Sequence, residues 1–119
     1  MSRILFAVAS LVLLTSSAMG HSSLERSEPK DGETLKVAPG EIRMWFTEPI
    51  KVGLSTFEVR NAAGKQIDQR DLRADGKQPA LVRLSLPAAL PSGTYTVTWS
   101  AVAQDLHVTK GNFSFRVAP

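Results

Sequence analysis

The sequence predicts an all-β fold, specifically an immunoglobulin-like Greek-key β-sandwich of about seven strands. Apolar and polar residues alternate over short stretches, turn-forming residues separate those stretches, and helical spacing is not sustained anywhere. About seven short strands in roughly 100 residues is the strand density of such sandwiches. We therefore expect one domain with its core between two sheets.

The first half of the domain contains short strands separated by recognisable turns. Residues 28–32 (EPKDG) combine a proline that fixes φ with a glycine that accepts positive φ, and residues 61–64 (NAAG) are typical of a hairpin. Ile42, Met44 and Phe46 alternate and should face the core. The strands expected here are residues 22–26 (at an edge), 41–46, 55–60 and 65–69.

The second half shows the clearest alternation. Residues 73–79 are polar, contain Gly76 and Pro79, and are expected to form a loop. Residues 90–93 (LPSG) form a second strong turn, and Tyr95 after it is typical of a corner where a tyrosine hydroxyl bonds back to the backbone. The strands expected here are residues 81–86, 94–102 and 111–117, with inward faces Val82/Leu84/Leu86, Tyr95/Val97/Trp99 and Phe113/Phe115/Val117.

The first 20 residues have the features of a cleaved secretory signal peptide. Arg3 provides a positive charge, residues 4–14 are mostly apolar, and Ala18 and Gly20 place small residues at the cleavage site. The apolar stretch is shorter than the roughly 20 residues that span a bilayer, although an uncleaved anchor is the alternative. We expect residues 1–20 to be removed and residues 21–119 to form an exported domain without a membrane span.

Composition narrows the function further. Lys and Arg exceed Asp and Glu by 14 to 11, but the basic residues form no run and are not interleaved with aromatic residues. A nucleic-acid partner is therefore not expected. The chain has no cysteine, and of its three methionines only Met44 lies beyond the leader. The exported domain thus lacks the clustered soft sulfur ligands that Cu(I) prefers.

Two histidines and one aspartate suggest a metal site. Cleavage after Gly20 makes His21 the first residue, so its α-amine and imidazole Nδ1 could chelate one ion together. Asp105 and His107 are two residues apart, so they would project from the same side of an extended segment. Three nitrogens with one carboxylate favour Cu(II) if the fold brings both regions to one end. We expect one Cu(II) ion per chain.

Less specific interpretations of these residues stay open. Asp105-Leu106-His107 is short, and such a segment is often a polar loop in which the aspartate caps a turn. Asp105 itself is either a direct ligand or a residue that orients a neighbour. Because His107 is the only histidine after His21, a histidine-based hydrolase is not expected.

Several motifs in this order resemble the CopC family of periplasmic copper-resistance proteins, including its YobA-like members. The resemblance covers the whole exported part of the chain. It begins with a histidine directly after the leader and includes residues 27–32 (SEPKDG), 46–49 (FTEP), 90–99 (LPSGTYTVTW), 105–107 (DLH) and 111–115 (GNFSF). Leu106, Val108 and Ala103 depart from residues frequent in the family, but the three candidate ligands are retained.

The resemblance implies a periplasmic Cu(II)-binding protein of the type without a methionine-rich Cu(I) site, with His21, Asp105 and His107 as metal ligands. It implies a role in copper sequestration or delivery, with a CopD-like inner-membrane copper protein as partner. We therefore expect a binding protein and not an enzyme. Two alternatives remain: a small oxidative copper enzyme of the lytic polysaccharide monooxygenase type, and a metal-free immunoglobulin-like interaction module.

Overall fold

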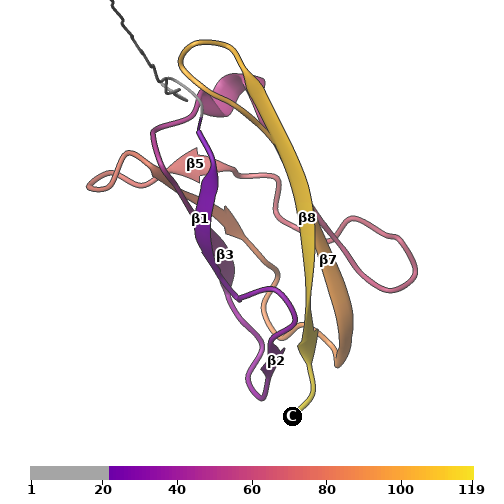
Figure 1. Cartoon of the computed structure of the whole chain (residues 1–119). Helices are drawn as coiled ribbons and strands as arrows, with labels where there is room; N and C mark the ends of the chain where they lie inside the picture. The colour runs from indigo at the N-terminus through magenta and orange to yellow at the C-terminus, as the bar shows by residue number, and fades with distance from the viewer. Residues whose placement is uncertain (1–21) are drawn as a thin grey trace, which may run out of the picture.

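The computed structural model describes residues 22–119, which form a sandwich of two four-stranded sheets (Figure 1). One sheet has the order β1-β3-β6-β5 and the other β2-β8-β7-β4. This confirms the predicted all-β, two-sheet class. The strands are β1 (Leu24–Glu28), β2 (Thr34–Leu35), β3 (Glu41–Phe46), β4 (Thr56–Arg60), β5 (Arg73–Ala74), β6 (Leu81–Ser85), β7 (Gly93–Val102) and β8 (Val108–Val117), with a short 3₁₀ helix η1 (Val52–Leu54) before β4.

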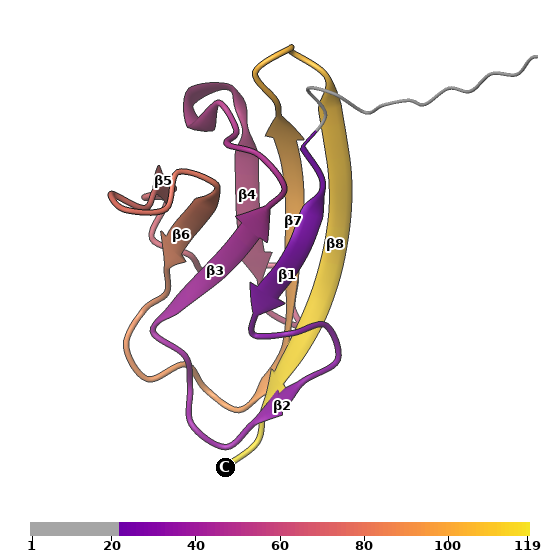
Figure 2. The ribbon, with the colours of Figure 1, turned by 60° about the vertical axis from the view of Figure 1, so that its left-hand side comes forward.

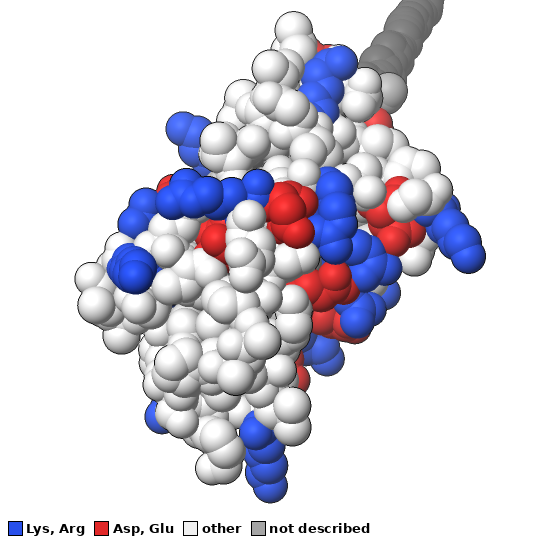
Figure 3. All heavy atoms as spheres, turned by 180° about the vertical axis from the view of Figure 1, so that it is seen from behind, with Lys and Arg blue, Asp and Glu red and all other residues white. Residues whose placement is uncertain are grey.

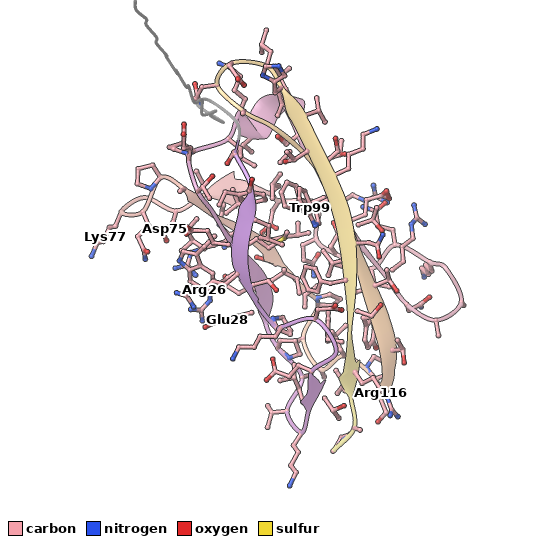
Figure 4. The ribbon with its side chains drawn as sticks, viewed as in Figure 1. Arg26, Glu28, Asp75, Lys77, Trp99 and Arg116 are labelled. Carbon is pink, nitrogen blue, oxygen red and sulfur yellow. The ribbon has the colours of Figure 1, made fainter. Side chains whose placement is uncertain are left out.

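The core follows the predicted alternation. In β3, Ile42, Met44 and Phe46 are all at most 2% exposed, and they pack against the inward residues of β6, β7 and β8. Trp99 of β7 lies between the two sheets, whereas Arg26 and Glu28 of β1 point away from the interior (Figure 4). Burying one face of each sheet against the other is what stabilises a sandwich that has no disulfide.

The expected tyrosine corner is present at the start of β7. The Tyr95 hydroxyl donates a 2.6 Å hydrogen bond to the carbonyl oxygen of Pro91. The Tyr95 ring stacks on Phe115 of β8, with ring centroids 5.5 Å apart. The turn and the core are therefore joined through a single side chain.

The predicted strand at residues 65–69 is wrong. After the Asn61–Gly64 turn, only an isolated bridge between Arg60 and Gln66 forms. The cause is Asp68, which is 7% exposed and accepts hydrogen bonds from the backbone N–H groups of Val59 and Arg70. These bonds bend the chain away from β4 and toward the opposite sheet, where the Gln69 N–H donates to the carbonyl of Ser85. The segment is a crossover.

Three further elements differ from the prediction. The short strands β2 and β5 were not expected, and β5 falls within residues predicted to be a loop. β8 begins at Val108, three residues before the predicted start, because residues 108–110 pair with β7 as far as Val102. This extension matters for the site, because it places His107 directly before the first paired residue of β8.

Gly111 lies opposite Trp99 in the β7–β8 hairpin. A Cβ atom there would lie 2.7 Å from Cζ2 and 2.9 Å from Cε2 of the indole ring. The ring has little room to move, because its centroid is 5.4 Å from that of Phe46 and 6.3 Å from that of Phe57. The absence of a side chain at Gly111 therefore allows the indole to cover this part of the hairpin.

We expect Gly111→Ala to lower the free energy of unfolding by about 1–3 kcal/mol, the usual cost of overpacking a core. Chemical denaturation would measure it. Gly40→Ala is the matched control, because a Cβ there meets nothing within 4 Å. Equal unfolding midpoints for the two variants would contradict the proposed contact with Trp99.

The outer face of the β1-β3-β6-β5 sheet carries interleaved acidic and basic side chains (Figure 3). Glu41 forms ion pairs with Arg43, Arg73 and Arg83, and Arg83 also pairs with Asp75 at 2.8 Å. Hydrogen bonds from the Lys77 backbone N–H, from Arg83 and from the Gln78 N–H lower the pKa of Asp75. The opposite charges compensate one another here, so this face provides no concentrated charge for an anionic partner.

Candidate metal centre

Asp105 and His107 lie in the loop that joins β7 to β8, formed by residues 103–107 and called here the metal loop. It follows the last β7–β8 pair, Val102 with Val108. The Ala103 N–H donates to the carbonyl of His107, and the Leu106 N–H donates to the carbonyl of Ala103, both at 2.9 Å. Figures 1 and 2 show this loop at the end of the sandwich where β1 begins.

Asp105 holds His107 through both carboxylate oxygens. Oδ1 accepts a 3.0 Å hydrogen bond from the His107 backbone N–H, and Oδ2 lies 2.6 Å from His107 Nδ1. Leu106 between them has φ of 72°, a left-handed conformation that is uncommon for residues other than glycine. This bend, and not the extended segment expected from the sequence, brings the carboxylate and the imidazole together, and the contact of Oδ1 with the His107 N–H is that of an aspartate that caps a turn.

The contact with Asp105 determines how the imidazole can act. An ionised carboxylate only accepts hydrogen bonds, so in a neutral imidazole this contact favours the tautomer with the proton on Nδ1 and the lone pair on Nε2. Neutral imidazole in this form is a common metal ligand, and a carboxylate behind it fixes the ring orientation. The His107 side chain is 63% exposed, so an ion can reach it from solvent.

The third predicted ligand, His21, lies outside the described residues. Its neighbour Ser22 is described, and its carbonyl oxygen accepts a 2.9 Å hydrogen bond from Oγ1 of Thr109. Thr109 comes two residues after His107. The start of the described chain is thus attached to β8 directly beside the metal loop.

Ser22 is also held from its other side. Its side chain is buried, at 1% exposure, and its hydroxyl donates a 2.6 Å hydrogen bond to the carbonyl of Glu48. The next residue, Ser23, forms two hydrogen bonds with Thr47. The Ser23 N–H donates to the Thr47 hydroxyl, and the Thr47 N–H donates to the Ser23 carbonyl. These contacts order the chain before β1 begins at Leu24.

The connector between β3 and β4 braces the metal loop as well. The Lys51 N–H donates to the Val102 carbonyl at 2.7 Å, and the Val102 N–H donates to the Ser55 hydroxyl at 2.9 Å. Ile50 forms a bridge with Ala103. Residues 47–55 therefore contact both the amino-terminal segment and the base of the loop that carries Asp105 and His107.

Sequence reasoning did not identify Ser22, Glu48, Ser55 or Thr109 as residues of this region. Their contacts join positions far apart in the chain, 87 residues in the case of Thr109 and Ser22. Serine and threonine carry no motif that would mark such a contact. Only the pairing of the sheets shows which of these residues meet.

Among residues 22–119, no group of three or more His, Cys, Asp or Glu side chains is placed to hold a metal ion. Asp105 and His107 are two of the three predicted ligands. The described part of the chain also contains no helix with the length and apolarity of a membrane span.

Comparison with known proteins identifies the family. The CopC domain model matches residues 24–118, which is nearly all of the described chain. The chain belongs to the CopC family. The predicted resemblance to this family is therefore confirmed.

Three named relatives match this CopC protein over most of its length. It is 28% identical over 115 residues to Protein YobA of Escherichia coli K12, covering 97% of this chain and 93% of YobA. It is 31% identical over 107 residues to Copper resistance protein C of Escherichia coli, covering 85% and 84%. It is 27% identical over 107 residues to Copper transport protein CutJ of Bacillus subtilis. That match covers 90% of this chain but spans only 20% of CutJ.

Solved structures agree with the CopC fold. CopC from Methylosinus trichosporium OB3b superimposes with a TM-score of 0.76 at 22% identity, covering 83% of this chain and 95% of that one. PcoC from Escherichia coli, described as a methionine-rich copper resistance protein, superimposes with a TM-score of 0.69 at 28% identity, covering 82% and 99%. Both chains are covered almost completely by the sandwich described above.

Proposed function

We propose that this CopC protein binds Cu(II) in the periplasm and sequesters the ion or delivers it to another component of copper homeostasis and resistance. The observation that carries the proposal is the 2.9 Å hydrogen bond between Thr109 Oγ1 and the Ser22 carbonyl. It anchors the residue that follows His21 beside the loop that bears Asp105 and His107. The membership of this chain in the CopC family and the copper-related names of its relatives support the same function.

The proposed ligands are His21, through its α-amine and Nδ1, and His107, through Nε2. A peptide bond keeps the Cα of residue 21 about 3.8 Å from that of Ser22. Ser22 in turn is hydrogen-bonded to Thr109, two residues from His107. Asp105 orients His107 through its contact with Nδ1, and to contribute an oxygen itself the carboxylate would have to leave Nδ1. This donor set suits Cu(II), which favours tetragonal nitrogen and oxygen coordination.

A soft-ligand Cu(I) site is not part of the proposal. Met44 is the single methionine beyond residue 20, and its side chain is 1% exposed between the two sheets. A thioether in that position cannot take up an ion from solvent without opening the core. This CopC protein therefore belongs, in our proposal, to a Cu(II)-only type.

Maturation is part of the proposal. Residues 1–20 would act as a signal peptide, and cleavage after Gly20 would leave residues 21–119 as the periplasmic domain. Delivery would proceed by ligand exchange at the exposed end of the sandwich, and the 63% exposure of His107 suits such exchange. We propose a CopD-like inner-membrane copper protein as the recipient. This domain matches only 20% of the length of the relative named Copper transport protein CutJ, and this supports the proposal that the domain works together with a second component.

The test is electron paramagnetic resonance of the processed protein with one equivalent of Cu(II). We expect a tetragonal spectrum with three nitrogen donors, one amine and two imidazoles. Copper should also raise the unfolding temperature, because an ion at 100 times its Kd stabilises the native state by about 2.7 kcal/mol.

Two outcomes would overturn the proposal in favour of the alternatives. An unchanged unfolding temperature with stoichiometric copper would indicate a metal-free interaction module. Turnover of a polysaccharide with ascorbate and peroxide would indicate an oxidative copper enzyme.

A further inference from the structure

We propose that Thr109 is a positioning residue for copper binding, which acts by clamping the amino-terminal segment against the metal loop. The clamp consists of Ser22, Glu48 and Thr109. The inference rests on the proposed function, because it concerns the same site. It assigns a role to a residue that is not itself a ligand.

The first contact of the clamp connects the two sheets. Ser22 leads into β1, the edge strand of one sheet, whereas Thr109 belongs to β8 of the other. The backbone of Thr109 pairs with Ala101 within the hairpin, so its side chain is not needed for strand pairing. The hydroxyl instead donates to the Ser22 carbonyl, which is part of the peptide group that joins residue 22 to residue 23.

The second contact prevents Ser22 from turning away. A hydroxyl at 1% exposure must be hydrogen-bonded, and the Ser22 hydroxyl donates to the Glu48 carbonyl. The carbonyl and the side chain of Ser22 are thereby held by two different elements. Ser22 is therefore fixed at two points.

Such fixation matters because a chain terminus is ordinarily flexible. If the segment before β1 moved freely, binding an ion through residue 21 would have to order it, and the lost conformational entropy would weaken affinity. With the clamp formed, Ser22 and Ser23 are already ordered in the metal-free protein. The metal loop is braced from the other side by Lys51 and Ser55, so the loop and Ser22 are both held before an ion arrives.

The experiment uses the processed protein beginning at His21 and compares Thr109→Val with Thr96→Val. Valine has nearly the same shape as threonine but lacks the hydroxyl. Thr96 is the matched control, because it is also half-buried and its hydroxyl also forms a hydrogen bond, in this case across the hairpin to Ser114 at 3.2 Å. It lies six residue pairs, about 20 Å, from the Val102–Val108 pair.

Cu(II) affinity would be measured by competition with a chromophoric chelator, and apo-protein stability by thermal unfolding. We expect Thr109→Val to bind Cu(II) about 10-fold more weakly, the lower end of the effect of residues that orient metal ligands. Thr96→Val should bind within twofold of the parent protein, and the two variants should unfold at similar temperatures. Thr109→Ser, which keeps the hydroxyl, should restore most of the affinity.

Equal Cu(II) affinity for the parent and Thr109→Val would overturn the clamp, and so would equal weakening by both valine variants. Failure of the parent protein itself to bind Cu(II) would instead overturn the proposed function. The two failures are therefore distinguishable in one set of titrations.

Discussion

Retaining one residue before His21 is expected to weaken Cu(II) binding by about 100-fold or more, beyond the usual effect of residues that only orient ligands. In the processed chain the α-amine is basic and can become a strong donor once its proton is displaced. An added residue turns it into an amide nitrogen, which is not basic, and also breaks the chelate ring. Chelator competition on the protein with and without Gly20 would measure the difference.

The control for this comparison is one glycine added after Pro119, at the opposite end of the sandwich (Figure 1). It should leave copper affinity unchanged. Equal affinity for the processed and amino-terminally extended proteins would exclude the α-amine as a ligand. It would leave Asp105 and His107 as the centre of a different site.

His107→Ala is expected to weaken Cu(II) binding by about 100-fold or more, again above the range for orienting residues. The substitution removes one imidazole nitrogen and leaves the Asp105 carboxylate without the ring that it orients. Stability of the metal-free protein should change by no more than about 0.5 kcal/mol, because the side chain is 63% exposed. Paramagnetic resonance of the copper-loaded variant should report one nitrogen donor fewer.

Gln104→Ala is the matched control for His107→Ala. Gln104 is an exposed polar residue of the same loop and is not among the proposed ligands. Its replacement should leave both affinity and nitrogen count unchanged. A His107→Ala variant with the full number of nitrogen donors would show that the ion binds elsewhere.

The strands with strict alternation were predictable because burial of one sheet face imposes a period of two on the sequence. Residues 41–46 and 94–102 are examples, and their inward side chains are the ones buried in the core. The failure at residues 65–69 has a specific cause. Their local pattern resembles a strand, but the buried Asp68 carboxylate binds backbone N–H groups that a strand would have used in its ladder.

The candidate site was only partly predictable for a related reason. Asp105 and His107 are close in sequence, so their approach depends on the local bend at Leu106. The contact of Ser22 with Thr109 depends on the packing of the sheets, because the two residues are 87 positions apart, and Ser22 precedes a strand of one sheet while Thr109 belongs to the other. No local pattern contains that information.

By itself, the amino-acid sequence determined the all-β class, most of the core, the tyrosine corner and the pair Asp105 and His107. These features follow from short-range periodicity, turn chemistry and spacing, which act within a few residues. Only the tertiary structure decided that the chain at Ser22 lies against β8 beside the metal loop, and that residues 47–55 brace both. The physical reason is that such contacts arise when two sheets pack face to face, and packing joins residues whose separation in sequence carries no signal.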